Sequence, residues 1–370
     1  MSRNVAGRTR SALLAATLLL AAGSAQAQDW QAEWAAALAQ SKGQDLNLTV
    51  HSYEAHEAVA REFQKKFPDI KVNVTAATPS STAPRIVTEQ KNGIYNVDSW
   101  WASTSNMNNI VLPADGFEKI TDYLILPEVK DPSKWQRPDM LYTSDRGPYI
   151  MVHSYYYEAI GFVNSNVVKG YKLENADQLL DPRLIGKIVI EDPRRPNGGS
   201  NGMAALLKLK GPDFISALFT KMQPTFMSIT RQVTDTVSRG DAVLAFGGNP
   251  ETMYQCWNAG GCKDISRMKQ FNYVLARGVA VLKNAPHKAA TKVWVNWLLS
   301  KEGQESYVQN WAKTNQSGAV SLRADVAPDP KHLDSVPDYS RLDQFVSVAT
   351  DSGAPVMEEV YRLLAKAQGR

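Results

Sequence analysis

The sequence has 370 residues, of which 44% are hydrophobic and 21% are charged. This composition excludes a largely disordered chain, a collagen-like polymer and a protein with many membrane spans, and the length predicts two domains because single cores stop growing at roughly 250–300 residues. The formal charge of +4 includes Arg3, Arg8 and Arg10. Without these three arginines the chain is nearly neutral and offers no electrostatic case for binding nucleic acid.

Met1–Ala27 has the pattern of a secretory signal peptide. It has a basic start, the apolar run Ala12–Ala22, and small residues at Ala25 and Ala27. The apolar run is far shorter than the roughly 20 residues of a membrane span, and no cysteine lies at the expected cleavage site that follows it. These features argue against a retained membrane anchor and against a lipoprotein, so we expect cleavage after Ala27 and a periplasmic product.

Strand and helix patterns alternate after Gln28. The predicted strands are Leu46–His51, Ile70–Ala76, Val97–Trp101, Lys187–Glu191, Ala242–Phe246 and Val279–Leu282. The predicted helices are Gln31–Gln40, Ala55–Phe67, Pro84–Asn92, Ser105–Leu112, Gly202–Lys210, Asp213–Met222, Arg231–Arg239 and Lys288–Leu299. Apolar strands that alternate with helices predict an α/β fold with mostly parallel sheets flanked by helices, and the Pro/Asp-rich segment Asp325–Asp338 is expected to cross the surface.

The two cysteines, Cys256 and Cys262, enclose a short segment that contains Trp, Asn and Gly. In an exported protein this pair predicts a local disulfide bond. The competing interpretation is a metal site. Two cysteines with no histidine or further cysteine nearby make a poor zinc site, so the disulfide is favoured.

Several segments resemble the periplasmic solute-binding proteins of ABC importers, nearest to the ferric-binding subgroup. In chain order they are Leu48–Tyr53, Phe67–Val72, Gly161–Asn164, Asp192–Arg194, Ser238–Ala245, Gly278–His287 and Trp297–Gln304. The resemblance implies a type II periplasmic-binding-protein fold, in which ligand binds between two lobes that close about a hinge.

The resemblance also implies how the chain divides between the lobes. Lobe one would hold residues 28–156 and 277–325, and lobe two residues 157–276 and 326–370. The strand Ile150–Asn164 would cross between the lobes, and the chain would return near Ala276–Val281.

The iron ligands of the ferric-binding relatives do not match this sequence. The histidine position falls on Ala55, with His56 adjacent, the glutamate position falls on Ser103, and the tyrosine pair falls on Pro250 and Glu251. Phenolate oxygens are the main ligands in that site, and Tyr254 alone does not replace two of them. The sequence therefore predicts a relative that binds an organic solute, with no metal and no cofactor, and a ferric carrier is the alternative.

An anion site is expected in the segment Asn197–Gly202, where the relatives place an anion on the start of a lobe-two helix. Glycines let a ligand approach the backbone, the Ser200 hydroxyl can donate, and a helix N-terminus carries partial positive charge. Arg194 and Arg195 precede the segment and offer bidentate contacts. The competing interpretation is an ordinary glycine-rich turn with solvated arginines.

Aromatic residues are predicted to bound the organic part of the ligand. They are Tyr53, Trp101 and Tyr156, chosen from a larger set that includes Trp100, Tyr155 and Tyr157. Core packing is expected to use at least half of that set. His51, Arg85 and Arg231 are further candidates for the cleft. The full predicted ligand set is Ser52, Tyr53, Trp101, Ser103, Tyr156, Arg194, Gly199, Ser200, Asn201, Asn249 and Tyr254.

A serine hydrolase is a remote alternative, because Gly198–Gly202 fits the pattern G-x-S-x-G. The two prolines between the preceding strand and Ser200 argue against a nucleophile elbow. We therefore expect a monomeric, non-enzymatic receptor. It would bind a small organic anion and then dock on an inner-membrane ABC permease, in either transport or sensing.

Overall fold

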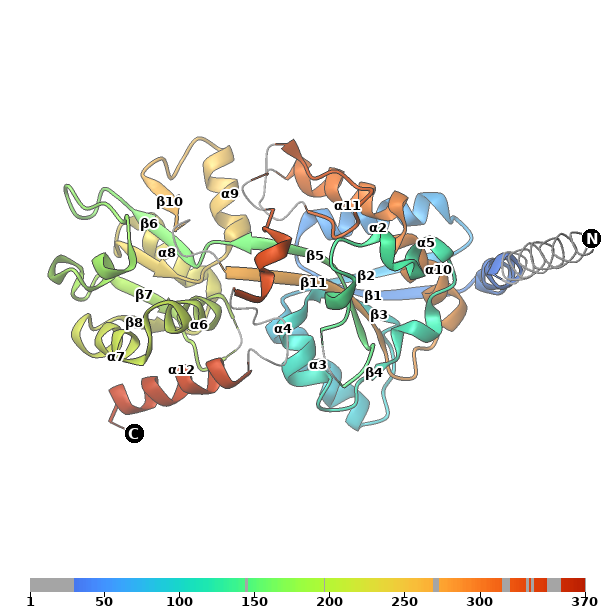
Figure 1. The fold of residues 1–370 in the computed structure, drawn as a ribbon, viewed down its shortest axis with the longest axis horizontal. Coiled ribbons are helices and arrows are strands. Elements are labelled where there is room, and N and C mark those ends of the chain that lie inside the picture. Colours follow the sequence, from blue (N-terminus) through green and yellow to red (C-terminus); the bar gives the residue numbers. More distant parts are fainter. Residues whose placement is uncertain are drawn as a thin grey trace, which may run out of the picture.

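The computed structural model describes residues 30–143, 146–195, 197–268, 273–314, 320–330, 333, 336–344 and 354–369. The predicted signal peptide, residues 1–27, lies outside the described residues. Two α/β lobes lie side by side, joined by the long strands β5 (Ile150–Glu158) and β11 (Tyr273–Leu282) (Figure 1). Within the described part of the chain, every helix is too short or too polar to cross a lipid bilayer.

Lobe one is built on a mixed sheet with the strand order β2-β1-β3-β11-β4, and β5 pairs with β11. Its other strands are β1 (Asp45–His51), β2 (Lys71–Ala77), β3 (Ser99–Ser103) and β4 (Phe117–Glu118). Strand β1 is parallel to β2 and β3, whereas β11 is antiparallel to β3, β4 and β5. The antiparallel pairs all involve β11, the returning strand.

Helices cover both faces of the lobe-one sheet. They are α2 (Glu54–Lys66), α3 (Pro79–Lys91), α4 (Thr104–Asn106), α5 (Pro127–Lys130), α10 (Lys288–Leu299) and α11 (Lys301–Lys313), preceded by a helix over residues 30–41. Short 3-10 or π turns are η1 (Met107–Val111), η2 (Ile120–Tyr123), η3 (Pro132–Lys134) and η4 (Pro138–Met140). The side chains of β3 alternate between the two faces: Trp101 enters the core with α2 and α10, and Trp100 enters the core with α3 and η1.

Lobe two is built on a second mixed sheet with the strand order β10-β6-β9-β7-β8. Its strands are β6 (Gly161–Asn164), β7 (Ile188–Glu191), β8 (Thr225–Met227), β9 (Leu244–Phe246) and β10 (Ile265–Arg267). Its helices are α6 (Gly198–Lys210), α7 (Pro212–Lys221), α8 (Thr230–Arg239), α9 (Pro250–Asn258) and α12 (Ala354–Ala367), with 3-10 turns η5 (Ala176–Leu180) and η6 (Pro182–Leu184). The 3-10 turn η9 (Tyr339–Gln344) places Leu342 in the lobe-one core, and its Tyr339 packs against both cores. The C-terminal helix α12 packs on α6 and α7.

The observed elements confirm the predicted α/β fold and correct several boundaries. The predicted crossing strand Ile150–Asn164 is two strands, β5 and β6, and each pairs in a different sheet. The helix predicted to begin at Pro84 begins at Pro79, which is also a favoured first helical residue. The segment Asn197–Gly202, predicted as a loop, is an N-cap followed by the first turn of α6.

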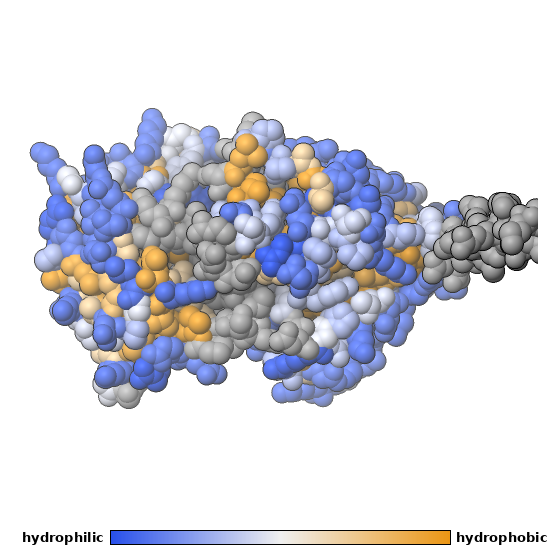
Figure 2. Space-filling model, in the orientation of Figure 1, coloured by the Kyte–Doolittle hydropathy of each residue, from blue (hydrophilic) through white to orange (hydrophobic). Residues whose placement is uncertain are grey.

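The surface of both lobes is mainly hydrophilic on the face in Figure 2, where hydrophobic residues are exposed in separate groups. The large hydrophobic residues that are exposed include Ile94 in lobe one and Ile185, Leu209 and Ile229 in lobe two. Single exposed apolar residues are normal on soluble proteins.

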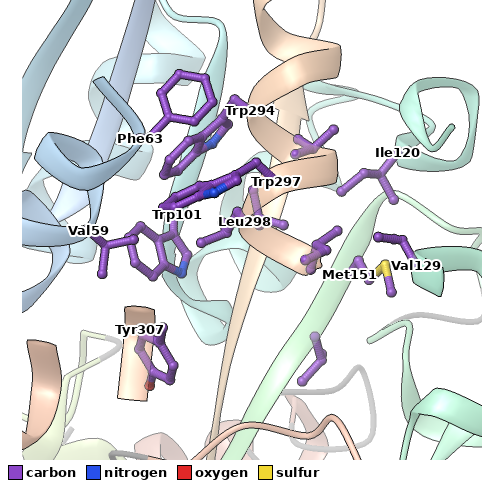
Figure 3. Packing of buried hydrophobic residues seen from close by; sticks show 14 of the residues in the cluster. Val59, Phe63, Trp101, Ile120, Val129, Met151, Trp294, Trp297, Leu298 and Tyr307 are labelled. Atoms are coloured by element: carbon purple, nitrogen blue, oxygen red, sulfur yellow. The ribbon is translucent and has the colours of Figure 1, made fainter. Parts of the chain in front are cut away.

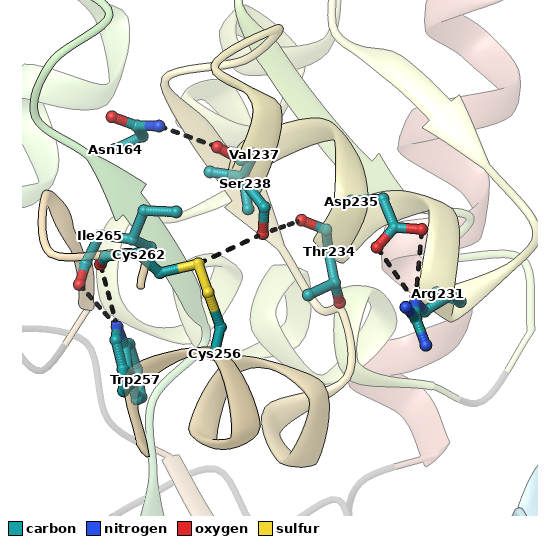
Figure 4. The surroundings of a disulfide bond; sticks show 10 residues. All are labelled: Asn164, Arg231, Thr234, Asp235, Val237, Ser238, Cys256, Trp257, Cys262 and Ile265. Atoms are coloured by element: carbon teal, nitrogen blue, oxygen red, sulfur yellow. Dashed lines mark hydrogen bonds and ion pairs between the residues drawn. A yellow bond between two sulfur atoms is a disulfide. The ribbon is translucent and has the colours of Figure 1, made fainter. Parts of the chain in front are cut away.

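The disulfide between Cys256 and Cys262 is formed, with the two Cα atoms 5.8 Å apart (Figure 4). It joins α9 to the chain that leads into β10. The Trp257 indole Nε1 donates to the carbonyl oxygens of Cys262 and Ile265, at 3.2 Å in each case. The predicted pairing is confirmed, and the bond and the indole together hold the end of α9.

Removal of this disulfide is expected to destabilise lobe two modestly. For so short a loop, the lost constraint on the unfolded chain amounts to about 2 kcal/mol. We expect the double variant Cys256→Ser/Cys262→Ser to unfold at lower urea concentration than the oxidised protein. Reductant should shift the wild-type transition in the same direction and leave the variant unchanged. An unchanged wild-type midpoint under reductant would show that the bond adds no stability.

Candidate functional site

A cleft of about 1000 Å³, including its solvent-open part, lies between the lobes. Its walls come from the segments that follow β1, β2 and β3 in lobe one and β7 and β9 in lobe two. In open α/β sheets this edge, at the carboxyl ends of the parallel strands, is where ligands bind. From lobe one the lining residues are His51, Ser52, Tyr53, Thr78, Pro79, Ser80, Ser103, Ser105 and Asn106. From lobe two and the crossing strands they are Ala159, Ile160, Gly161, Phe162, Glu191, Asn197, Gly198, Asn201, Thr230, Gly247, Gly248, Asn249, Pro250, Arg267 and Leu275.

The first residues of five helices line this cleft. Tyr53 and Thr78 occupy the N-cap positions of α2 and α3 without a capping hydrogen bond from their side chains. The side chains of Asn197 and Asn249 cap α6 and α9, and Thr230 is the first residue of α8. Each helix has nine residues or more. The positive ends of five helix dipoles therefore converge on one cleft, which favours a negatively charged group there.

The predicted anion site on α6 is organised differently from the expectation. Asn197 and Ser200 form a capping box: Asn197 Oδ1 accepts from the Ser200 N–H at 2.9 Å, and Ser200 Oγ accepts from the Asn197 N–H at 2.9 Å. Ser200 is fully buried, and its hydroxyl donates to the Asn197 carbonyl oxygen. The Ser200 hydroxyl is thus committed to the helix and is not an exposed nucleophile.

A carboxylate of the protein itself occupies the end of α6. Glu191, the last residue of β7, lines the cleft but is only 4% exposed. Its Oε1 accepts from the Thr230 hydroxyl, and its Oε2 accepts from the Gly248 N–H at 3.3 Å. Burial raises the pKa of Glu191, and hydrogen bonds from Thr230 and from the Gly248, Gly199 and Gly198 N–H groups oppose that rise.

The structure brings five of the predicted ligand residues together on the cleft. They are Ser52, Tyr53, Ser103, Asn201 and Asn249. Gly199 and Ser200 lie on α6 directly behind the wall formed by Asn197, Gly198 and Asn201.

The other predicted ligand residues lie elsewhere, as do two of the further candidates. Arg194 forms an ion pair with Asp192, and Tyr254 accepts from Arg267 at 2.8 Å. Arg85 pairs with Glu89, and Arg231 pairs with Asp235. Each of these four polar contacts explains the position of its side chain without a ligand.

The prediction that Trp101 faces the cleft is wrong. Its side chain is completely buried in the lobe-one core, where it packs against Val59, Trp294 and Tyr307 (Figure 3). Its indole N–H donates to His153 Nε2 at 2.7 Å. Strand β3 is central and both of its faces are covered, so its alternation decides which core a ring enters, and neither face opens to the cleft.

Tyr156, the third predicted aromatic, is also buried. It lies on the crossing strand β5, with its ring 4.1 Å from the Arg277 guanidinium. Arg277, on β11, also lies 3.8 Å from the Trp311 ring and 5.6 Å from the Tyr53 ring. Tyr156 thus packs against a buried cation between the lobes, and only Tyr53 of this aromatic group reaches the cleft.

Three histidines lie close to this buried cation. Burial, and secondarily the positive charge of Arg277, lowers the pKa of His51 and of His153 to about 3. The same two causes, in the same order, hold the pKa of His56 well below its usual value. His51 lines the cleft, so the cleft floor presents a neutral imidazole.

Glu191, Asn106, Arg267, Thr230, Thr78 and Ser80 line the cleft but were absent from the predicted ligand set. Glu191 ends an apolar strand pattern, which indicates a strand and carries no signal of a cleft residue. A sequence signal did exist for Thr78 and Thr230, because Ser and Thr are common at helix starts. Among the described residues, no three His, Cys, Asp or Glu side chains come close enough to hold a metal ion.

Comparisons with known proteins agree with this architecture. Residues 142–310 match the family described as bacterial extracellular solute-binding protein. An uncharacterized protein of Haemophilus influenzae is 24% identical over 290 residues, which are 75% of this chain and 79% of that protein.

Solved structures are similar over nearly the whole chain. The periplasmic binding protein P5PA has a TM-score of 0.65 at 17% identity, covering 87% of this chain and 99% of its own. The substrate-binding protein of an ABC transporter from Agrobacterium tumefaciens has a TM-score of 0.63 at 18% identity, covering 87% and 94%. AfuA from Actinobacillus pleuropneumoniae, with exogenous fructose-6-phosphate bound, has a TM-score of 0.60 at 19% identity, covering 87% and 97%. Ferric-binding proteins also share the fold.

The two lobes and the cleft between them have the fold of type II periplasmic binding proteins. Residues 142–310 thus carry the likeness to bacterial extracellular solute-binding proteins, and the solved structures share the fold over nearly the whole chain.

Proposed function

We propose that this protein is the periplasmic receptor of an ABC importer and captures a small organic anion between its lobes. In this proposal residues 1–27 are removed on export, and closure of the lobes about β5 and β11 presents the ligand to an inner-membrane permease. The likeness to the Agrobacterium tumefaciens substrate-binding protein supports the transport role. The N-termini of α2, α3, α8 and α9 that converge on the cleft carry the assignment of an anion, whereas Glu191 already occupies the end of α6.

Arg267 adds to this preference for an anion. It is the single Lys or Arg among the described residues that line the cleft, and its Nη1 donates to the Tyr254 hydroxyl at 2.8 Å. In our proposal Arg267 and the helix ends hold the charged group. Ser52, Tyr53, Ser103, Asn201 and Asn249 contact the rest of the ligand, and Tyr254 orients Arg267. Gly199 and Ser200 shape the wall behind them.

A thermal-shift screen tests this function. A ligand that binds only the folded protein raises stability by RT ln(1 + [L]/Kd). We expect stabilisation by at least one member of a panel of organic phosphates and carboxylates. The variant Arg267→Gln should weaken binding of that anion about tenfold or more, because it removes the positive charge from the wall. Arg231→Gln is the matched control, since Arg231 pairs with Asp235 and does not line the cleft.

Two results would reject the assignment of an organic anion. One is stabilisation by ferric salts with none by organic anions, which would favour the ferric carrier. The other is equal loss of affinity in Arg267→Gln and Arg231→Gln, which would show that the effect is not local to the cleft.

A further inference from the structure

The Glu191 carboxylate is enclosed where four segments of lobe two meet. Glu191 is the last residue of β7 and is only 4% exposed. Its hydrogen-bond donors come from three other segments: the Thr230 hydroxyl from the start of α8, the Gly248 N–H from the connection between β9 and α9, and the Gly198 and Gly199 N–H groups from the start of α6. A carboxylate offers about four acceptor sites, so these donors use its capacity within the protein.

Glycines leave the space that this carboxylate occupies. A Cβ atom added to Gly247 would lie 2.6 Å from Glu191 Oε2, and one added to Gly198 would lie 3.3 Å from the same oxygen. Gly247 also has a φ of +83°, a conformation that favours glycine. The hole around the carboxylate is therefore formed largely by backbone atoms. Converging backbone N–H groups at a helix N-terminus are a common way to bind a free anion.

The enclosed carboxylate joins the parts of lobe two that line the cleft. The start of α6 carries Asn197 and Asn201 on the cleft wall, and the connection before α9 carries Asn249. This connection is tied to α8 a second time, because the Asn249 N–H donates to Thr234 Oγ1 at 2.6 Å. Loss of the carboxylate would leave its buried donors without an acceptor, which is costly, and would release the three segments from one another.

We propose that Glu191 acts as a resident anion: its carboxylate permanently fills an anion-binding hole that positions the lobe-two wall, and the hole accepts a free small carboxylate when the side chain is removed. This inference goes beyond the proposed function and holds for any solute of the cleft. It makes Glu191 a positioning residue rather than a contact of the solute.

Chemical rescue of Glu191→Ala tests the inference. The substitution removes the atoms of an acetate ion and leaves the donors in place. In sodium chloride, we expect the variant to unfold at lower urea concentration than wild type. Sodium formate or acetate at the same ionic strength should restore at least half of the lost midpoint, because an anion that binds only the folded protein stabilises it. Butyrate, which is too long for the hole, should restore much less.

Wild type and two further variants separate this rescue from any other effect of the salts. The rescue is the gain of Glu191→Ala in excess of the gain that the same salt gives to wild type, which includes any binding of acetate elsewhere in the cleft. Glu191→Gln fills the hole with a neutral amide and should gain no more than wild type. Asp192→Ala removes the adjacent carboxylate, which pairs with Arg194 outside the cleft, and should also gain no more than wild type.

Three results would overturn the inference. The first is a Glu191→Ala variant that is as stable as wild type in chloride. The second is a gain in formate and acetate no larger than that of wild type or of Glu191→Gln. The third applies if Glu191→Ala does not fold in chloride: refolding in acetate would then support the inference, and failure to fold in both salts would reject it. None of these results depends on the identity of the solute, so they leave the proposed function to its own test.

Discussion

Acidification from pH 6.5 toward pH 3 is expected to destabilise the folded protein steeply, because the buried histidines near Arg277 are neutral in the folded state. Burial first, and then the charge of Arg277, lowers the pKa of His51 and His153 to about 3. In the unfolded chain a histidine titrates near pH 6.5. Between these values the unfolded state binds protons that the folded state cannot, so stability falls as the pH falls.

His153 shows why the folded state resists protonation. Its Nε2 accepts from the Trp101 indole N–H at 2.7 Å, so that nitrogen carries no proton. Its Nδ1 lies 3.3 Å from Gln304 Oε1, which can only accept, so Nδ1 carries the proton. The two contacts fix one neutral tautomer, and a second proton on Nε2 would point at the indole N–H.

Urea unfolding at a series of pH values measures this effect. Each such histidine contributes up to about 1.4 kcal/mol of lost stability per pH unit between its two pKa values. The variant His153→Gln should be less stable than wild type at neutral pH, because the contact to Trp101 is disturbed. Between pH 6 and pH 4, its free energy of unfolding should nevertheless change less with pH than that of wild type. The difference in slope should be about 1.4 kcal/mol per pH unit, which corresponds to one proton. An equal slope in the two proteins would show that His153 is not among the groups that resist protonation.

The sequence was sufficient to predict those features that depend on local pattern. The apolar strands, the helix after β1 and the Cys256–Cys262 pair all follow from periodicity, composition or spacing, and the structure contains them. Five predicted ligand residues also line the cleft. They lie at or near the ends of strands or the starts of helices, where the position along the chain largely fixes the position in the fold.

The wrong predictions concern how deeply a side chain is buried and which group occupies a helix end. A local sequence pattern contains neither kind of information. Alternation along β3 separates Trp100 from Trp101, but whether a ring reaches the cleft depends on the helices that cover each face of the sheet. The anion site on α6 failed for another reason. Glu191 lies only a few residues earlier in the chain, and its carboxylate reaches the helix end from β7. The N-terminus of α6, which the sequence predicts as the site of a ligand anion, is occupied by the Glu191 carboxylate of the protein itself.

Gly199→Ala is expected to be among the most destabilising single methyl additions in lobe two, because this glycine admits the backbone of β7 rather than a ligand. A Cβ atom at Gly199 would lie 2.0 Å from the Glu191 carbonyl oxygen and 2.8 Å from its carbonyl carbon. Those atoms belong to a strand paired on both sides, to β8 and β9, and have little room to move. Separating α6 from β7 would also displace the Glu191 side chain from the cleft wall.

Gly202→Ala, on the same helix, provides the graded control. Its added Cβ would lie 3.2 Å from its nearest neighbours, the Cβ and carbonyl oxygen of Ile160, so a small adjustment relieves it. Alanine also favours a helix interior by about 1 kcal/mol over glycine, which offsets part of that cost. We expect Gly199→Ala to lose about 3 kcal/mol or more in urea unfolding, and Gly202→Ala to remain within about 1 kcal/mol of wild type. If Gly199→Ala were as stable as wild type and lost only ligand affinity, the glycine would serve ligand approach after all, as the sequence first indicated.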